Sequence, residues 1–226
     1  MKSIFITGIG TGIGKTLVAA IVTEALQAAY WKPVQAGFAD GTDRQWVEEM
    51  AGLLKGQGDI RIFPETYKLS LPASPHVSAR EEGLEISLDR IASQYRDIGG
   101  QVPEDGYLVI EGAGGVLVPL NEREFVADLI QQLDATVLLV SRNYLGSINH
   151  SLLTAAHCKA RGLKVAGWIF NDQFGNYETE IAGWTGLPVL ASIPYAERLD
   201  REFIREQAER IGPALRKALE PLDFLS

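Results

Sequence analysis

Cysteine and closely spaced histidines are almost absent from this sequence. Cys158 is the only cysteine, and the three histidines, His76, His150 and His157, do not have a close metal-ligand spacing. An intrachain disulfide and a cysteine-rich zinc site are therefore excluded. Because a lack of disulfides is typical of proteins in a reducing compartment, we expect the protein to be cytoplasmic.

Long apolar runs and an excess of positive charge are absent as well. Residues 1–7 reach a glycine cluster after an apolar stretch that is too short for a signal-peptide core or a membrane span. The chain has 21 Lys and Arg against 29 Asp and Glu, a formal net charge of -8. Nucleic-acid affinity rests largely on Lys and Arg that neutralise phosphates. We therefore expect small-molecule partners, no nucleic acid and no membrane.

What the sequence does contain is an alternation of short apolar runs and segments with helical spacing. The apolar, β-rich runs predict strands at residues 3–7, 107–110, 136–140, 165–170 and 189–193. Helical spacing predicts helices at residues 15–29, 44–54, 88–95, 147–160 and 201–219, the last interrupted by Pro213. Pro- and Gly-rich stretches predict long loops at residues 71–76 and 99–106.

This alternation predicts the fold class. Strands that alternate with helices favour an α/β fold in which a mostly parallel β-sheet is flanked by helices on both faces. With 226 residues, 46% of them hydrophobic, the chain can bury one substantial core. We therefore expect residues 1–226 to form a single domain.

The most informative motif is a glycine-rich segment between the first predicted strand and the first predicted helix. It reads Gly8-Ile9-Gly10-Thr11-Gly12-Ile13-Gly14-Lys15-Thr16. In a phosphate loop, backbone N–H groups and the helix N-terminus bind phosphate oxygens, the lysine reaches the β and γ phosphates, and the hydroxyl binds magnesium. The general pattern requires glycine where Ile9 stands, so this loop is slightly unusual. The motif predicts a P-loop NTPase-like fold that binds ATP, with an ordinary glycine-rich turn as the alternative.

An acid follows another predicted strand. Residues 107–115 place Glu111 at the end of an apolar run and before a glycine turn. Ligands in open α/β folds bind outside the carboxyl ends of strands, so we expect Glu111 to approach a magnesium held by Thr16, with Asp43 as a further carboxylate. The alternatives are that Glu111 is a helix cap or a surface acid, and that Asp43 is the N-cap of the following helix.

Several separated motifs together resemble the dethiobiotin synthetase family. They are Gly14-Lys15-Thr16, Lys32-Pro33-Val34, Ser74-Pro75-His76, Glu111-Gly112-Ala113-Gly114-Gly115, Gly146-Ser147-Ile148-Asn149-His150 and Gly167-Trp168-Ile169-Phe170-Asn171-Asp172. A phosphate loop is shared by many ATPases, but its combination with the other motifs is much more specific. The motifs span most of the chain in the family's order, and the family's longer glycine spacing, Gly8 to Gly14, is also present.

The resemblance implies an ATP-dependent cyclo-ligase of biotin biosynthesis. In the family, 7,8-diaminononanoate takes up CO2 as a carbamate, ATP converts the carbamate to a carbamic-phosphoric anhydride, and the second amine displaces phosphate. Dethiobiotin, ADP and phosphate result. By resemblance, the catalytic residues Lys15 and Lys32 stabilise the carbamate and the transferring phosphoryl group. By residue type alone, Lys32 is a solvated lysine at a strand end.

The resemblance also implies which residues bind ATP and Mg2+. Thr16, Asp43 and Glu111 would share the magnesium. Asn171 would read the adenine and residues 194–196 would close over it, although an asparagine that ends a strand is also a common turn former. The implied nucleotide site consists of Gly12, Ile13, Gly14, Lys15, Thr16, Leu17, Asp43, Glu111, Gly112, Ala113, Gly114, Asn171, Asp172, Pro194, Tyr195 and Ala196.

In the family the substrate lies between two subunits, so the resemblance implies a homodimer. Residues 144–149 resemble the segment that holds the substrate's fatty tail and carboxylate from the partner, and helix N-terminal amides suit a carboxylate. The implied substrate site consists of Thr11, Ala36, Ser74, Pro75, Gly146, Ser147, Ile148 and Asn149. His150 and His157 are assigned no catalytic role.

Ser74 and His76 are a potential nucleophile and base. Adjacent residues rarely face each other, and no strained strand-helix elbow surrounds them. We therefore interpret residues 74–76 as a substrate loop and not as a hydrolase site.

Departures from the family pattern leave other functions open. The family usually has a hydroxyl residue where Ala36 stands, and commonly threonine and an acid where Ile9 and Gly12 stand, so substrate affinity or nucleotide choice is expected to differ. Ala36 and Ile9 leave a catalytically lapsed paralogue, which binds nucleotide as an interaction module, as an alternative. The presence of Lys15, Lys32, Asp43 and Glu111 argues against it.

Two further alternatives share the phosphate loop. A positioning or regulatory ATPase usually carries a signature lysine early in this loop, and residues 8–12 contain none. A ligase that amidates a carboxylate would need an ammonia source, and 226 residues leave no room for a glutaminase domain.

Overall fold

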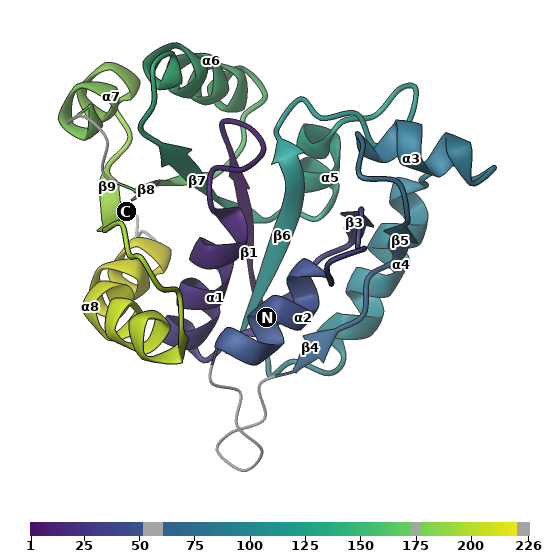
Figure 1. Ribbon diagram of the computed structural model, residues 1–226, viewed down its shortest axis with the longest axis horizontal. Coiled ribbons are helices and arrows are strands. Elements are labelled where there is room, and N and C mark those ends of the chain that lie inside the picture. Colours follow the sequence, from purple (N-terminus) through teal and green to yellow (C-terminus); the bar gives the residue numbers. More distant parts are fainter. Residues whose placement is uncertain (52–60, 173–176, 221–226) are drawn as a thin grey trace, which may run out of the picture.

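In the part of the chain that the structure describes, seven parallel strands form a central sheet (Figure 1). The computed structural model describes residues 1–51, 61–172 and 177–220. The strand order is β4-β2-β6-β1-β7-β8-β9, and each pairing between neighbours is parallel. The strands are β1 (Lys2–Gly8), β2 (Ala29–Trp31), β4 (Ile62–Phe63), β6 (Tyr107–Gly115), β7 (Thr136–Arg142), β8 (Val165–Asn171) and β9 (Val189–Ile193). The predicted α/β fold with a parallel sheet is confirmed.

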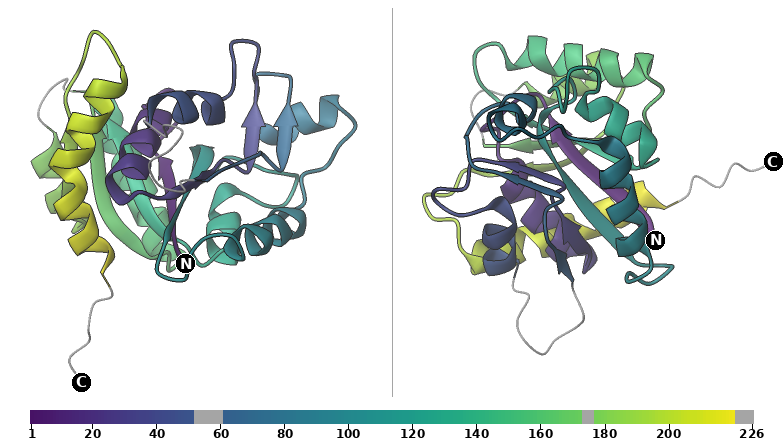
Figure 2. Two further views of the ribbon diagram at one scale, coloured as in Figure 1. Left: turned by 90° about the horizontal axis from the view of Figure 1, so that it is seen from below. Right: turned by 90° about the vertical axis from the view of Figure 1, so that its right-hand side faces the viewer.

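Two short strands form a separate parallel ladder. β3 (Val34–Ala36) pairs with β5 (Tyr67–Leu69), and Figure 2 (left) shows them on the opposite side of the molecule from α8 (Arg201–Leu219). Pro33 lies between β2 and β3 and has no N–H to donate to a ladder. The chain therefore leaves the main sheet at Lys32 and Pro33, which places Lys32 at the carboxyl end of β2.

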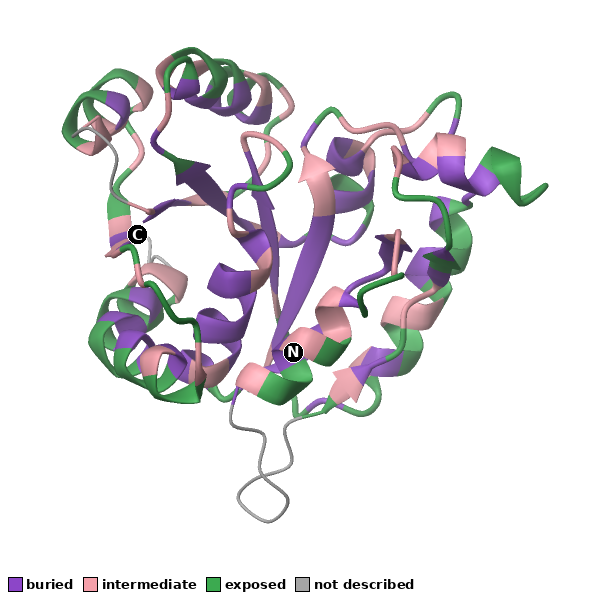
Figure 3. Cartoon of the chain, viewed as in Figure 1, coloured by how far each residue is buried: buried purple, intermediate pink, exposed green. Residues whose placement is uncertain are grey.

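Helices cover both faces of the sheet because side chains alternate along each strand. On β1, Ile4 and Ile6 belong to one hydrophobic cluster and Phe5 to the other. The Ile4 face is covered by α1 (Lys15–Leu26), α2 (Asp43–Met50) and α8, and the Phe5 face by α4 (Leu88–Gly99), α5 (Val126–Gln132), α6 (Ser147–Ala160) and α7 (Glu178–Thr185). α3 (Pro75–Glu81) contacts β3 and β5. Figure 3 shows the central strands buried between these layers.

All five predicted strands and the predicted helices are present, but several boundaries differ. The predicted helix 15–29 is too long, because α1 ends at Leu26, Gln27 is left-handed (φ 51°) and β2 begins at Ala29. The predicted loop 71–76 is wrong at its end, because α3 begins at Pro75, whose fixed φ suits the first turn of a helix. Pro213 does not interrupt α8.

Other elements were not predicted or were predicted with different lengths. α2 begins at Asp43 and ends at Met50, and residues 52–54 of the predicted helix lie outside the described residues. α4 continues beyond residue 95 to Gly99. The short strands β2, β3, β4 and β5 and the short helices α3, α5 and α7 were missed. Their length is the cause, because two to eight residues give too little periodicity to identify an element.

The carboxyl ends of β1, β6, β7 and β8 meet at one edge of the sheet, where the loop between β1 and α1 lies (Figure 1). This edge is where ligands bind in open α/β folds. Among the described residues, no helix has both the length and the apolar character that crossing a membrane requires.

Candidate nucleotide and substrate site

The phosphate loop connects β1, which ends at Gly8, to α1, which begins at Lys15. Gly14 is the N-cap of α1 with φ 89°, a conformation that favours glycine, and a Cβ there would lie 1.9 Å from Asn171 Nδ2. Asn171 in turn donates a hydrogen bond from Nδ2 to the Ile13 carbonyl (3.0 Å). The end of β8 therefore packs on the loop and fixes its last turn. No side chain caps α1, so its N-terminus faces the loop as an anion site.

Two cavities flank this loop. The lysine cavity, about 770 Å³, is lined by Thr11, Gly12, Gly14, Lys15, Thr16, Lys32, Val34, Gln35, Ala36, Asp43, Pro72, Ala73, Ser74, Pro75, Glu111, Ala113, Gly114 and Val118. The arginine cavity, about 670 Å³, is lined by Thr11, Gly12, Ile13, Arg142, Asn143, Tyr144, Leu145, Asp172 and Tyr195. Thr11 and Gly12 line both, so the phosphate loop separates two spaces that one extended ligand can reach.

Glu111 is the centre of a buried cluster in the lysine cavity. Its Oε1 accepts hydrogen bonds from Thr16 Oγ1 (2.8 Å) and Lys32 Nζ (2.9 Å), and its Oε2 accepts one from Tyr30 Oη (2.7 Å). Lys32 also forms an ion pair with Asp43. Because Glu111 is 1% exposed and Lys32 is 6% exposed, neither is the surface residue that residue type alone allowed.

Burial and neighbouring charges set the pKa values of Lys15 and Lys32. Burial lowers the pKa of Lys15 to about 8, opposed by Glu111 and assisted by the positive charge of Lys32. For Lys32, burial alone would lower the pKa, but the Glu111 and Asp43 carboxylates outweigh it and raise the pKa. Lys32 therefore carries a permanent positive charge. Burial, followed by the Glu111 charge, raises the pKa of Tyr30 well above its ordinary value, so Tyr30 is a neutral donor.

The start of α2 positions Asp43. Thr42 is the N-cap of this helix, and its side chain forms a reciprocal capping box with Gln45. Asp43 is therefore the first helical residue and not the N-cap. Its backbone N–H also donates to Gln35 Oε1 (3.2 Å) on β3, which ties the helix to the strand that lines the cavity. The Asp43 carboxylate is held beside Lys32 as a result.

In the arginine cavity, two side chains of opposite charge lie at the neighbouring ends of β7 and β8. Arg142 donates to Asp172 Oδ2 from Nε (2.9 Å) and Nη2 (2.6 Å). Asp172 has a left-handed backbone (φ 62°) that turns the chain away from β8. Tyr195, which follows β9, is largely exposed and lines the same space. The ring of Tyr195 and the charged side chains of Arg142 and Asp172 suit a planar heterocycle with polar edges.

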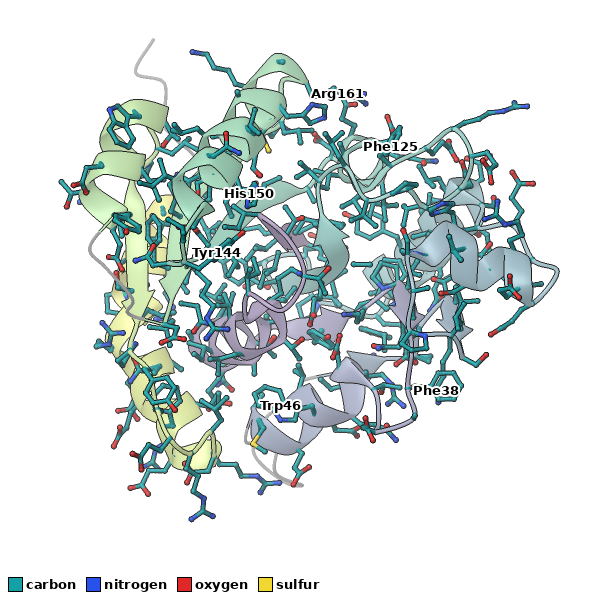
Figure 4. The ribbon with its side chains drawn as sticks, turned by 45° about the horizontal axis from the view of Figure 1, so that its top comes forward. Phe38, Trp46, Phe125, Tyr144, His150 and Arg161 are labelled. Atoms are coloured by element: carbon teal, nitrogen blue, oxygen red, sulfur yellow. The ribbon has the colours of Figure 1, made fainter. Side chains whose placement is uncertain are left out.

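The segment before α6 borders the arginine cavity. Gly146 (φ 104°) is the N-cap of α6, and Tyr144 Oη contacts His150 Nδ1 at 2.6 Å, near the start of the helix (Figure 4). Leu145, between these residues, is 92% exposed. Leu145 also lines the arginine cavity, so an apolar side chain stands in solvent at its border.

Comparison with known sequences shows the family. Residues 2–203 match a family described as an AAA domain. The ATP-dependent dethiobiotin synthetase BioD of Cytophaga hutchinsonii is 48% identical over 213 residues, which cover 93% of this chain and 97% of that protein. The BioD protein of Christiangramia forsetii is 41% identical over 95% of this chain and 98% of its own length. The chain belongs to the dethiobiotin synthetase family. The predicted resemblance is confirmed.

Solved structures of more distant proteins share the fold of this dethiobiotin synthetase family member. The MinD cell division protein of Aquifex aeolicus has a TM-score of 0.56 at 15% identity over 96% of each chain. MinD of Pyrococcus horikoshii, in complex with Mg-ADP, has a TM-score of 0.55 at 15% identity over 99% of this chain and 96% of its own. At this identity the likeness shows the P-loop NTPase fold alone and does not favour the positioning ATPase among the alternatives.

The structure brings most of the site residues predicted for a dethiobiotin synthetase to the two cavities. The exceptions, which line neither cavity, are Leu17, Gly112, Gly146, Ser147, Ile148, Asn149, Asn171, Pro194 and Ala196. Leu17 and Ser147 are buried, and Ile148 packs against the core. Gly112 is packed so closely that a Cβ would lie 2.7 Å from Phe5 Cε1.

The loop that contains Ser74 and His76 differs from the prediction in one respect. His76 Nδ1 lies 3.1 Å from Ser74 Oγ, so the two side chains do face each other. They do so because Ser74 is the N-cap of α3 and His76 lies in its first turn. Ser74 and Pro75 line the lysine cavity, and their role as a substrate loop stays a prediction.

Sequence reasoning missed several residues around the two cavities. Tyr30 and Gln35, which contact Glu111 and Asp43, flank the predicted Lys32-Pro33-Val34 motif. Their position on either side of this motif is the signal that points to them. Arg142 is a charged residue at the end of an apolar strand, a pattern similar to the one that identified Glu111.

Proposed function

We propose that the protein is an ATP-dependent dethiobiotin synthetase that closes the ureido ring of dethiobiotin from 7,8-diaminononanoate and CO2. The observation that carries this proposal is the pair of buried lysines, Lys15 and Lys32, that line one cavity beside the phosphate loop. A carbamate and a transferring phosphoryl group are both anionic, and two preorganised cations in a buried site stabilise both. Family membership agrees with this chemistry.

ATP would lie across the phosphate loop. Its triphosphate would occupy the N-terminus of α1 and reach the lysine cavity, because Lys15 and Thr16 line that space. The base would occupy the arginine cavity, between Asp172 and Tyr195. Asn171 uses one N–H on the Ile13 carbonyl and keeps its amide oxygen for a base edge.

The oxygen atoms around Lys32 fit magnesium. The Thr16 hydroxyl and the Asp43 and Glu111 carboxylates are hard donors, and the Lys32 ammonium already stands between the two carboxylates as a cation. No cluster of three or more His, Cys, Asp or Glu able to hold a metal exists in residues 1–51, 61–172 and 177–220. Phosphate oxygens would complete the coordination, as is usual for magnesium. Bound there, magnesium would neutralise charge on the phosphates.

The reaction follows three steps in this cavity. One substrate amine attacks the carbon of CO2 and loses a proton, which gives the carbamate. A carbamate oxygen then attacks the γ phosphorus while the bond to the β-phosphate oxygen breaks, which gives the carbamic-phosphoric anhydride and ADP. The second amine attacks the carbonyl carbon, loses its proton, and displaces phosphate as the ring closes.

Lys15 and Lys32 act on the charges of these steps. Lys32 stays protonated because Asp43 and Glu111 raise its pKa, so it can bind the carbamate and the anhydride without proton exchange. Lys15, at the end of the phosphate loop, would bind the γ phosphate and stabilise its charge during transfer. Ser74 and Ala36 line the same cavity and would contact the substrate. Ala36 has no hydroxyl and would make only apolar contact with the substrate.

We infer that the active form is a homodimer. Exposed Leu145 borders the arginine cavity at the start of α6, and burying this side chain against a second copy would remove apolar surface from water. Gly146, Ser147, Ile148 and Asn149 line neither cavity of their own chain. A partner that receives the exposed Gly146 and Asn149 beside its lysine cavity would give the start of α6 the role implied for the substrate carboxylate. Residues 1–226 would act as one domain in the cytoplasm.

The proposal is tested by phosphate release from ATP, magnesium and bicarbonate, with and without 7,8-diaminononanoate. We expect release that depends on the diamine. Release at the same rate without the diamine would favour a regulatory ATPase, and no release under either condition would favour a lapsed paralogue.

A further inference from the structure

Tyr30 occupies a position that the proposed catalytic residues do not explain. It is fully buried in β2, and its Oη donates a 2.7 Å hydrogen bond to Glu111 Oε2. Filling the core requires only the ring. A phenylalanine would do this without placing a polar hydroxyl in the interior, where an unpaired hydroxyl is unfavourable. The hydroxyl therefore has a role that depends on its hydrogen bond to Glu111.

The sheet register fixes the contact between Tyr30 and Glu111. Tyr30 pairs with Val109 on the neighbouring strand β6, and Glu111 is two residues further along β6. Residues two apart on a strand point to the same face, so Tyr30, Val109 and Glu111 share the face that α1 covers. Thr16, in the first turn of α1, approaches Glu111 from that side.

The two carboxylate oxygens of Glu111 have different partners. Oε1 accepts from Thr16 and Lys32, both of which line the lysine cavity, while Oε2 accepts from Tyr30 in the core. A carboxylate with one oxygen held by a rigid phenol cannot rotate freely about its last torsion. We propose that Tyr30 is a positioning residue, whose hydroxyl holds Glu111 Oε2 so that Oε1 faces Thr16, Lys32 and the magnesium of the bound nucleotide.

This inference rests on the magnesium ligands of the proposed function. Groups that hydrogen-bond a metal ligand orient it, and removing one typically weakens metal binding about 10- to 100-fold. We therefore expect Tyr30→Phe to raise the magnesium concentration that half-saturates ATP binding by about 10- to 100-fold. ATP affinity in a chelator should remain that of the wild type, because Tyr30 does not line either cavity.

The experiment is calorimetric ATP binding over a magnesium titration, for the wild type, Tyr30→Phe and Tyr95→Phe. Tyr95 is a matched control because its hydroxyl also has a hydrogen bond, at 2.6 Å to Ser3 Oγ, away from both cavities. A folded Tyr30→Phe protein with the magnesium requirement of the wild type would overturn the inference. If Tyr30→Phe changes this requirement while the wild type shows no diamine-dependent phosphate release, the proposed function fails and the inference stands.

Folding of the variant provides a second measurement. If Tyr30→Phe does not fold, the cause under this inference is Glu111 Oε2, which loses its hydrogen-bond donor while Thr16 and Lys32 still hold Oε1. The loss of stability caused by Tyr30→Phe should then be smaller in a Glu111→Gln background, where the oxygen is no longer part of a charged group. An equal loss in both backgrounds would mean that the hydroxyl acts independently of Glu111, which also overturns the inference.

Discussion

At the scale of single residues, the pKa of Lys15 gives ATP binding a pH dependence. Burial lowers this pKa to about 8, so the charged form that binds phosphate declines as pH rises through 8 in the free protein. Binding above that pH requires proton uptake, and ATP affinity should fall by at most about tenfold per pH unit. Calorimetry from pH 7 to pH 10 measures this decline.

The control for this prediction is Lys15→Arg. Arginine stays charged over the whole range, so its ATP affinity should be flat with pH even if it is weaker overall. An equal decline in both proteins would assign the pH dependence to another group.

Lys32 should matter for turnover much more than for ATP binding. Lys32→Gln removes the cation between Asp43 and Glu111, and loss of one such electrostatic group costs about 10²- to 10³-fold in turnover. ATP affinity should be largely retained because Lys15 stays on the phosphate loop. Lys164→Gln, which removes an exposed ion pair with Asp134, is the matched control. Steady-state kinetics of both variants decide, and undiminished turnover in Lys32→Gln would remove Lys32 from the mechanism.

At the scale of elements, the start of α2 links helix stability to the magnesium site. Thr42→Ala removes the N-cap, which should lower the free energy of unfolding by about 1 kcal/mol. It should also weaken magnesium-dependent ATP binding, because Asp43 is the next residue. Ser87→Ala removes a comparable cap from α4, distant from the cavities, and should lower stability alone. Equal magnesium requirements in the two variants would mean that the start of α2 does not position a magnesium ligand.

The elements also show how far the sequence could predict the fold. The β1-loop-α1 unit was predictable because strand, glycines, lysine and helix are contiguous. β2 was missed because Ala29, Tyr30 and Trp31 continue the apolar pattern of α1, and only the left-handed Gln27 ends that helix. A single backbone conformation of this kind leaves almost no trace in residue type.

Contacts across the sheet were less predictable than the phosphate loop. Glu111 was placed at a strand end and Lys32 was assigned by family resemblance, but their contact joins residues 79 positions apart, and the contact of Glu111 with Tyr30 joins residues 81 apart. Both depend on which strands are neighbours and in which register. Residue spacing along one strand contains no information on strand neighbours or register. The sequence could therefore predict that Glu111 lies near the nucleotide site, but not its contacts.

At the scale of the whole molecule, the inferred homodimer predicts an effect of Leu145. Leu145→Asp places a charge at the inferred contact and should weaken self-association at least about tenfold, because burying an unpaired carboxylate is strongly unfavourable. Sedimentation equilibrium measures this effect. Leu84→Asp, at another exposed leucine near α3, should leave self-association unchanged. A wild-type protein that is fully active as a strict monomer would contradict the dimer.

For the whole molecule, the reaction that we propose joins CO2 and the diamine into a ring at the expense of ATP. The most direct test is mass spectrometry of the product from 7,8-diaminononanoate, ATP, magnesium and 13C-labelled bicarbonate. We expect dethiobiotin that carries the label at its ureido carbon, in an amount equal to the phosphate released. Phosphate release without labelled, ring-closed product would contradict it.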